Sequence, residues 1–212
     1  MISYDYAETL LPLFLEKTSH IPYQDYGILP LEAFSLYVFC KSNEIHILIE
    51  SGTANGYSTE VLANVIPECK IITIDSNQNY GSGMQNSTKN RLAYLTNITF
   101  LTGNSFDLID SIIQDNKDLN IGTFIDGPKG SNARLLANQT LKHNNIKFSS
   151  CHDQMQANSN YLFCPNLDAT FKSKFEFIND KINQLPSVKD KFKTIKQVWP
   201  DGMGIILFNK PI

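Results

Sequence analysis

The stretch from Ile45 to Asp75 most constrains what this chain can fold into. Two apolar runs, each followed by an acid, enclose a turn with two glycines and a helix-forming segment. In order, these are Ile45–Ile49 with Glu50, the turn Ser51–Gly56, the segment Tyr57–Val65, and Lys70–Ile74 with Asp75. A strand, a tight turn, a helix and a second strand ending in an acid form half of a nucleotide-binding βαβ unit.

The glycines and acids of this stretch point to a nucleoside ligand. Gly52 and Gly56 can adopt positive φ and let a ligand approach the backbone closely. The helix that follows begins with unpaired N–H groups, which favour a carboxylate or phosphate. Asp75 lies 19 residues after Gly56 and can accept hydrogen bonds from ribose hydroxyls. The alternative is a plain βαβ unit whose glycines only shape a turn; the two acids favour the nucleoside site.

The turn also carries a family resemblance. It spells E-x-G-x-x-x-G, without the G-x-G-x-x-G of NAD-binding proteins. It resembles motif I, D/E-x-G-x-G-x-G, of the class I S-adenosylmethionine-dependent methyltransferases, with Ala54 at the middle glycine. The following Gly-Tyr-Ser-Thr resembles small bacterial O-methyltransferases, and the later stretch Phe124–Gly130 resembles bacterial methyltransferases of sugar and natural-product pathways. The resemblance implies that the cofactor contacts include Glu50, Gly52, Thr53, Ala54, Gly56, Tyr57, Ser58, Asp75 and Ser76.

A third predicted strand, Ile98–Thr102, ends in Gly103-Asn104-Ser105. The family usually has Gly-Asp-Ala/Ser here, with the acid on the adenine amino group. The resemblance therefore adds Asn104 and Ser105 to the cofactor contacts, and the amide oxygen of Asn104 can still accept a hydrogen bond from that amine. Alternatively, Asn104 caps the next predicted helix, Phe106–Gln114. Both roles remain open.

The fourth predicted strand, Ile121–Ile125, ends in Asp126-Gly127-Pro128-Lys129-Gly130. Ligands of α/β sheets bind at such strand ends. The spacing Asp126-x-x-Lys129 resembles the metal-dependent catechol-type enzymes, which implies that Asp126 is a metal ligand and that Lys129 assists deprotonation of the acceptor hydroxyl. As alternatives, Asp126 hydrogen-bonds the cofactor or caps the turn, as in metal-free relatives, and Lys129 is a solvated lysine.

The fifth predicted strand, Ile146–Cys151, is followed by His152-Asp153-Gln154. Catechol-type enzymes have Asp-Asn here, so the resemblance implies that Asp153 joins Asp126 in binding Mg²⁺ through oxygen ligands. His152 has two alternatives. It is a general base that deprotonates the acceptor without a metal, or a structural histidine with its hydrogen bonds satisfied.

Composition excludes several other classes. The chain has 212 residues and a net charge of −3, with no basic block, so no nucleic-acid partner is expected. No apolar run approaches the roughly 20 residues that span a bilayer, and the N-terminus does not resemble a signal peptide. Four cysteines without C-x-x-C spacing indicate reduced thiols and a cytoplasmic location.

The remaining segments complete a chain of alternating elements. A helix with Leu10, Leu11 and Phe14 on one face is expected within residues 1–20, and another over Leu31–Lys41 with Ala33, Leu36, Tyr37 and Cys40 on its packed side. Further along, the predicted elements are a loop at Ser76–Ser87, helices at Thr88–Leu95, Ser131–Lys142 and Thr170–Leu185, a loop or substrate wall at Asn158–Cys164, and strands at Lys191–Trp199 and Met203–Phe208.

These patterns predict one three-layer α/β domain with a Rossmann-like methyltransferase fold. Its sheet is mostly parallel and seven-stranded, with helices on both faces and, by resemblance, an antiparallel seventh strand. Residues 1–41 form a helical cap, 42–153 the cofactor-binding core, and 154–212 the substrate side and C-terminal strands. The implied function is O-methylation of a small molecule or sugar by S-adenosylmethionine, with Mg²⁺ and a homodimer both possible. An NAD-type oxidoreductase and a non-catalytic binding module remain as alternatives.

Overall fold

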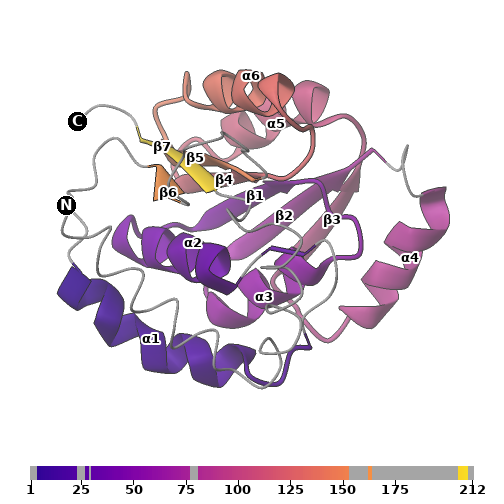
Figure 1. Ribbon diagram of the computed structural model, residues 1–212. Coiled ribbons are helices and arrows are strands. Elements are labelled where there is room, and N and C mark those ends of the chain that lie inside the picture. The colour runs from indigo at the N-terminus through magenta and orange to yellow at the C-terminus, as the bar shows by residue number, and fades with distance from the viewer. Residues whose placement is uncertain are drawn as a thin grey trace.

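The chain alternates strands and helices around one sheet (Figure 1). The structure is a computed structural model and describes residues 4–22, 27–28, 30–76, 81–152, 162–163 and 205–209. The helices are α1 (Tyr4–Thr18), α2 (Pro30–Ser42), α3 (Tyr57–Val65), α4 (Gly81–Arg91), α5 (Ser105–Asp115) and α6 (Ser131–Thr140). The strands are β1 (Ile47–Ser51), β2 (Lys70–Asp75), β3 (Ile98–Thr102), β4 (Ile121–Ile125), β5 (Ile146–Cys151), β6 (Leu162–Phe163) and β7 (Ile205–Asn209).

The seven strands lie in the order β3-β2-β1-β4-β5-β7-β6. Strands β1 to β5 pair in parallel, and β7 is antiparallel to β5. Helices cover both faces, with α1, α2 and α3 on one side and α5 and α6 on the other (Figure 1). Leu48 packs toward the first group and its neighbours Ile47 and Ile49 toward the second, because side chains alternate along a strand. The predicted mostly parallel, three-layer fold is confirmed.

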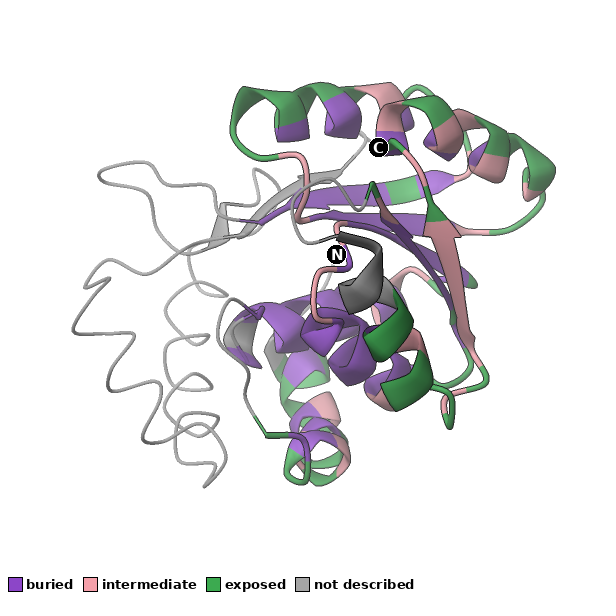
Figure 2. Ribbon diagram, turned by 90° about the vertical axis from the view of Figure 1, so that its right-hand side faces the viewer, coloured by how far each residue is buried: buried purple, intermediate pink, exposed green. Residues whose placement is uncertain are grey.

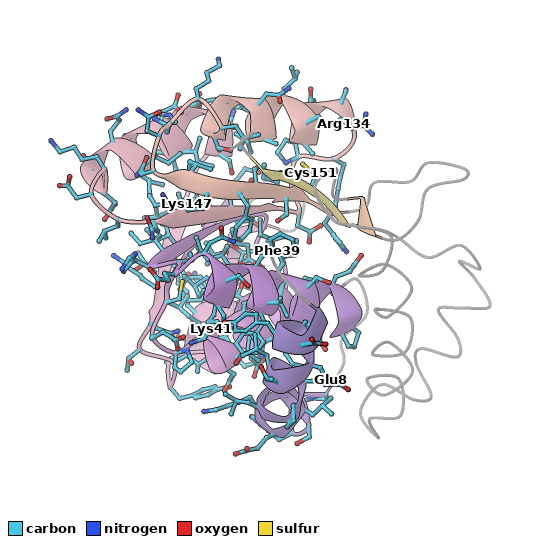
Figure 3. All side chains as sticks on the ribbon, turned by 90° about the vertical axis from the view of Figure 1, so that its left-hand side faces the viewer. Glu8, Phe39, Lys41, Arg134, Lys147 and Cys151 are labelled. Atoms are coloured by element: carbon cyan, nitrogen blue, oxygen red, sulfur yellow. The ribbon has the colours of Figure 1, made fainter. Side chains whose placement is uncertain are left out.

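Helix α2 is buried on every side, whereas the sequence predicted one packed side. Phe39 contacts Phe148 of β5, with ring centroids 5.8 Å apart, and Figure 3 shows it between the helix and the sheet. On the opposite side, Phe34 meets Phe14 of α1 at 5.1 Å. Figure 2 shows the purple, buried interior that results. The four residues predicted on the packed side are buried, and the burial extends around the helix because α1 and the sheet cover opposite sides of it. A helix that is apolar all round is typical of such a buried position.

Helix α4 lies earlier in the chain than predicted. It covers Gly81–Arg91, although Ser76–Ser87 was predicted as loop and Thr88–Leu95 as helix. The prediction followed helix propensity, which is poor in this Gly-, Asn- and Ser-rich stretch. Contacts with the glycine turn stabilise the helix instead: Thr88 Oγ1 donates to the carbonyl of Ala54 at 3.4 Å. Tertiary packing contributes more to a helix of this length than propensity does.

The C-terminal part is described only in two strands. β7 overlaps the predicted strand Met203–Phe208. It pairs with β6 at the edge of the sheet, and β6 lies in the stretch Asn158–Cys164, which was predicted as loop or substrate wall. Asp153, the predicted helix Thr170–Leu185 and the predicted strand Lys191–Trp199 lie outside the described residues. None of the helices described has both the length and the apolar character needed to cross a bilayer.

Three asparagines fix the points where strands enter the sheet. Asn97, Asn120 and Asn145 directly precede β3, β4 and β5. Each side-chain amide donates to two or three backbone carbonyls that follow or end an earlier helix. Carbonyls at helix ends lack intrahelical partners and need such donors. The asparagines therefore anchor the amino ends of these three strands to the ends of earlier helices.

The turn after β1 and the loop after β4 touch at the crossover point of the sheet. The carbonyl of Ser51 accepts the N–H of Asp126 at 2.8 Å and that of Gly127 at 2.7 Å. Gly52 has a φ of +98°, and a Cβ there would lie 2.7 Å from the backbone nitrogen of Gly127. A side chain at position 52 would therefore push the two loops apart.

We expect Gly52→Ala to lower the free energy of unfolding by about 2–5 kcal/mol, from backbone strain and overpacking together. Gly130→Ala is the control, because Gly130 also has positive φ, +63°, but nothing lies within 4 Å of the point that a Cβ would occupy there. It should lose only the strain component, about 1–3 kcal/mol. Urea denaturation measures both variants. An equal loss in both would show that the contact with Gly127 is unimportant.

Candidate active site

Asp75, at the end of β2, holds the glycine turn. Its Oδ2 accepts the N–H of Thr53 at 3.0 Å and of Ala54 at 2.9 Å. Ala54 has a φ of 44°, a conformation that glycine adopts at lower cost, so these hydrogen bonds help to keep the turn in place. The turn ends at Gly56, directly before α3. Carboxylate, turn and helix start therefore meet at the carboxyl ends of β1 and β2, where α/β folds bind ligands.

Glu50 lies beneath the turn and points into the protein. It is fully buried and accepts hydrogen bonds from the hydroxyls of Ser58 and Thr59. Burial raises the pKa of Glu50 to about 7, although the hydroxyls of Ser58, Thr59 and Thr73 oppose the shift. Glu50 and Ser58, both expected at the cofactor, thus bind each other. This hydrogen bond connects the end of β1 to the start of α3, on either side of the turn.

Arg91 of α4 clamps the other side of the turn. One guanidinium nitrogen pairs with Glu60 of α3, and Nη2 donates to the carbonyl of Asn55 at 2.7 Å. Tyr94 also donates to Glu60, at 3.0 Å. Nothing in the sequence points to these contacts of Arg91, because an arginine in a predicted helix gives no signal of its partner. Together with Asp75, it keeps the turn in one conformation.

Asn104 and Ser105, which follow β3 and were both expected to contact the cofactor, lie in different environments. Asn104 is exposed, and its Oδ1 accepts the N–H of Phe106 at 3.0 Å, so it caps α5 as one of the alternatives predicted. Ser105 is buried, with its hydroxyl 2.6 Å from that of Ser51. The cap uses one lone pair of the Asn104 oxygen and leaves the other for a ligand.

Three more of the expected cofactor residues occupy different environments. The Thr53 side chain is buried, with its Oγ1 2.6 Å from that of Thr73. Tyr57 is buried in the hydrophobic core on the α1–α3 side of the sheet. Ser76 is exposed directly after β2. Of these three side chains, only that of Ser76 faces solvent.

Asp126, at the end of β4, is the centre of a charged cluster. Its Oδ1 pairs with the ammonium of Lys129 and lies 2.7 Å from His152 Nδ1. The other ring nitrogen of His152, Nε2, lies 3.0 Å from Oε2 of Glu32 in α2. Glu32 and His152 are buried, whereas the Lys129 side chain is 54% exposed. The structure therefore brings together all three predicted catalytic residues and adds Glu32.

The charges of this cluster are mutually stabilised. Burial alone would lower the pKa of His152, but the carboxylates of Glu32 and Asp126 hold it well above the usual value of 6.5. Burial would likewise raise the pKa of Asp126, but His152 and Lys129 lower it to about 2. Each ring nitrogen of His152 faces a carboxylate, which can only accept, so both nitrogens donate and neither has a lone pair for a substrate proton. This geometry does not favour His152 as the general base.

The described donors do not suit Mg²⁺. Oδ1 of Asp126 already accepts hydrogen bonds from the ammonium of Lys129 and the imidazolium of His152. The positive charges of these two groups oppose the binding of a cation. Mg²⁺ prefers several oxygen ligands in octahedral geometry. No group of three or more metal-binding side chains occurs among the residues described, and Asp153 lies outside them.

Glu32 is a second residue of the site that was not predicted from the sequence. It is the one acid in the otherwise apolar and small-residue run Leu31–Cys40. Acids are almost never fully buried without a partner, so an isolated acid in a helix predicted to pack was a usable signal. The signal did not identify His152 as the partner, because the two are 120 residues apart.

Comparisons with known proteins identify the family of this chain. A family model described as O-methyltransferase matches residues 2–142, which is 141 of 212 residues. The solved structure of cofactor-bound Rv0187 from MTB is 14% identical, with 87% of this chain and 80% of that chain covered and a TM-score of 0.51. The O-methyltransferase from Bacillus cereus in complex with SAH is 16% identical, with 87% and 81% covered and a TM-score of 0.49. No curated protein matches the chain.

The likeness to Rv0187 agrees with the three-layer fold described above. The family match extends from α1 beyond the end of α6, so it contains the glycine turn, Asp75 and Asp126. It favours the predicted methyltransferase over the NAD-type oxidoreductase. The chain belongs to the O-methyltransferase family, and it is a methyltransferase of the S-adenosylmethionine-dependent class that its glycine turn resembles.

Proposed function

We propose that this enzyme transfers the methyl group of S-adenosylmethionine to a hydroxyl oxygen of a small molecule without using a divalent metal. One observation carries the proposal. Asp75, the glycine turn and the start of α3 meet at the strand ends, and the turn contacts the loop that bears Asp126 and Lys129. A cofactor site and an acceptor site built on these two loops would be adjacent.

The chain offers matching groups for each part of the cofactor. Asp75 would accept hydrogen bonds from the ribose hydroxyls, and the positive end of the α3 helix dipole would favour the methionine carboxylate. The second lone pair of the Asn104 amide oxygen would accept from the adenine amine. When bound, S-adenosylmethionine supplies an electrophilic methyl group on a sulfonium.

Lys129 is proposed to activate the acceptor. A hydroxyl is a poor nucleophile at neutral pH, and a nearby positive charge lowers its pKa. Lys129 is the exposed member of the charged cluster, and Asp126 anchors its ammonium. Lys129 would therefore stabilise the developing oxyanion while the proton leaves to solvent.

The class of acceptor and the assembly are open to direct tests. Catechol-type and sugar hydroxyls are the two acceptor classes to compare, by measuring S-adenosylhomocysteine release with each. A homodimer would be revealed by sedimentation of the purified chain.

Asp75→Asn should weaken the binding of S-adenosylhomocysteine by about 1–2 kcal/mol, the value of one or two hydrogen bonds to a charged acceptor. Isothermal calorimetry measures it. Asp115→Asn, an exposed acid at the end of α5, is the matched control and should bind as the wild type does. Unchanged affinity in Asp75→Asn would remove Asp75 from the cofactor site.

Lys129→Gln should lower kcat for the acceptor roughly ten- to hundredfold, because the oxyanion loses its electrostatic partner. Lys129→Arg keeps the charge and should retain more activity. Lys142→Gln changes a lysine just beyond α6, away from the cluster, and serves as control. Full activity in Lys129→Gln would eliminate this lysine from the mechanism.

Turnover should be the same with millimolar Mg²⁺ and with EDTA, because ammonium and imidazolium occupy the place of a metal beside Asp126. Calorimetric titration of Mg²⁺ into the protein should show no binding. Activity that disappears in EDTA and returns with Mg²⁺ would overturn the metal-free mechanism and restore Asp126 and Asp153 as candidate ligands.

A further inference from the structure

Glu32 reaches the strand-end cluster from the N-terminal helices. It lies in the first turn of α2, and its Oε2 is 3.0 Å from Nε2 of His152. On the opposite side of the ring, Nδ1 is 2.7 Å from Oδ1 of Asp126. The Glu32 side chain is 5% exposed and that of His152 is 2% exposed. A buried chain of hydrogen bonds therefore connects α2 to the end of β4.

The imidazole ring of His152 is held from several directions. Its backbone N–H donates to the carbonyl of Ile125 at 2.8 Å, and its ring packs on Phe124 with centroids 5.9 Å apart. Carboxylates only accept hydrogen bonds, so each ring nitrogen donates to its carboxylate. The ring cannot rotate without losing one of these two bonds. Glu32 thus determines the direction in which Nδ1–H points at Asp126.

We propose that Glu32 is a positioning residue for methyl transfer, which acts through His152 to fix Asp126, and with it the ammonium of Lys129, at the end of β4. The inference rests on the proposed function for its catalytic consequence. Lys129 and His152 share the same oxygen of Asp126, so a change in one hydrogen bond is transmitted to the other. A displacement of about 1 Å in a positioned group can cost roughly a hundredfold in rate.

A role in stability alone predicts a different result. Buried ion pairs often add little net stability compared with apolar residues, because desolvation offsets their attraction. Truncation of one partner is nevertheless destabilising, so a loss of stability by itself would not identify positioning. A change in kcat at unchanged KM, with partial recovery by a residue that keeps only the hydrogen bond, would identify it.

The experiment compares Glu32→Ala and Glu32→Gln with wild-type protein. Glu68→Gln is the matched control, because Glu68 pairs at 2.6 Å with Lys41 in the last turn of the same helix. Three quantities are measured on the full chain: affinity for S-adenosylhomocysteine, kcat and KM for the acceptor, and the proton resonance of His152 Nδ1–H. The chain has four histidines, and His152→Gln assigns the resonance.

Glu32→Ala should lower kcat roughly ten- to hundredfold with little change in KM or in S-adenosylhomocysteine affinity, and should shift or broaden the Nδ1–H resonance. Glu32→Gln retains an acceptor oxygen and should recover part of kcat. Glu68→Gln should resemble the wild type throughout. Wild-type kcat in Glu32→Ala, or an equal loss in Glu68→Gln, would overturn the proposal.

The resonance separates this inference from the proposed function. If the wild type binds no S-adenosylhomocysteine and transfers no methyl group, the proposed function fails. Independently of that result, an unchanged Nδ1–H signal in Glu32→Ala would refute the proposal that Glu32 acts through His152. If Glu32→Ala does not fold, Glu32→Gln carries the test, since a wild-type resonance and kcat there would show that the charge of Glu32 has no part in placing Asp126.

Discussion

The contact between the turn after β1 and the loop after β4 is the constraint on which the site depends. The carbonyl of Ser51 accepts two N–H groups from that loop, and the hydroxyl of Ser51 bonds to the carbonyl of Gly127 and to Ser105 at the start of α5. The ends of β1, β4 and β3 therefore meet at one residue. The close approach requires a glycine at position 52, because any Cβ would enter the backbone of Gly127. The proposed cofactor and acceptor sites are neighbours for this reason.

Acids lie at the carboxyl ends of three strands, and each has hydrogen-bond or charge partners within the protein. Hydroxyls surround Glu50, turn N–H groups bind Asp75, and two cationic side chains bind Asp126. These acids hold the turn and Lys129 in place before a ligand arrives. Preorganisation of this kind lowers the free energy that binding and the transition state would otherwise lose to rearrangement.

The parts predicted correctly are those that depend on local pattern. β3, β4 and β5 have the predicted bounds, because short apolar runs between turn residues specify buried parallel strands. The position of α4 was predicted wrongly and the burial of α2 was underestimated, because contacts of α4 with the glycine turn and of α2 with α1 outweigh local propensity. Whether His152 could act as a base could not be decided from the sequence, because the answer depends on where Glu32 and Asp126 lie around its ring.

The sequence by itself determined the βαβ unit, the glycine turn and the acids at the strand ends, because each follows from residues within one short stretch. Only the tertiary structure decided how those acids are used. The partners of Asp126 lie three and 26 positions along the chain, and Glu32 lies 120 positions from His152. Protonation and hydrogen-bond direction depend on distances between such groups, and folding alone sets those distances.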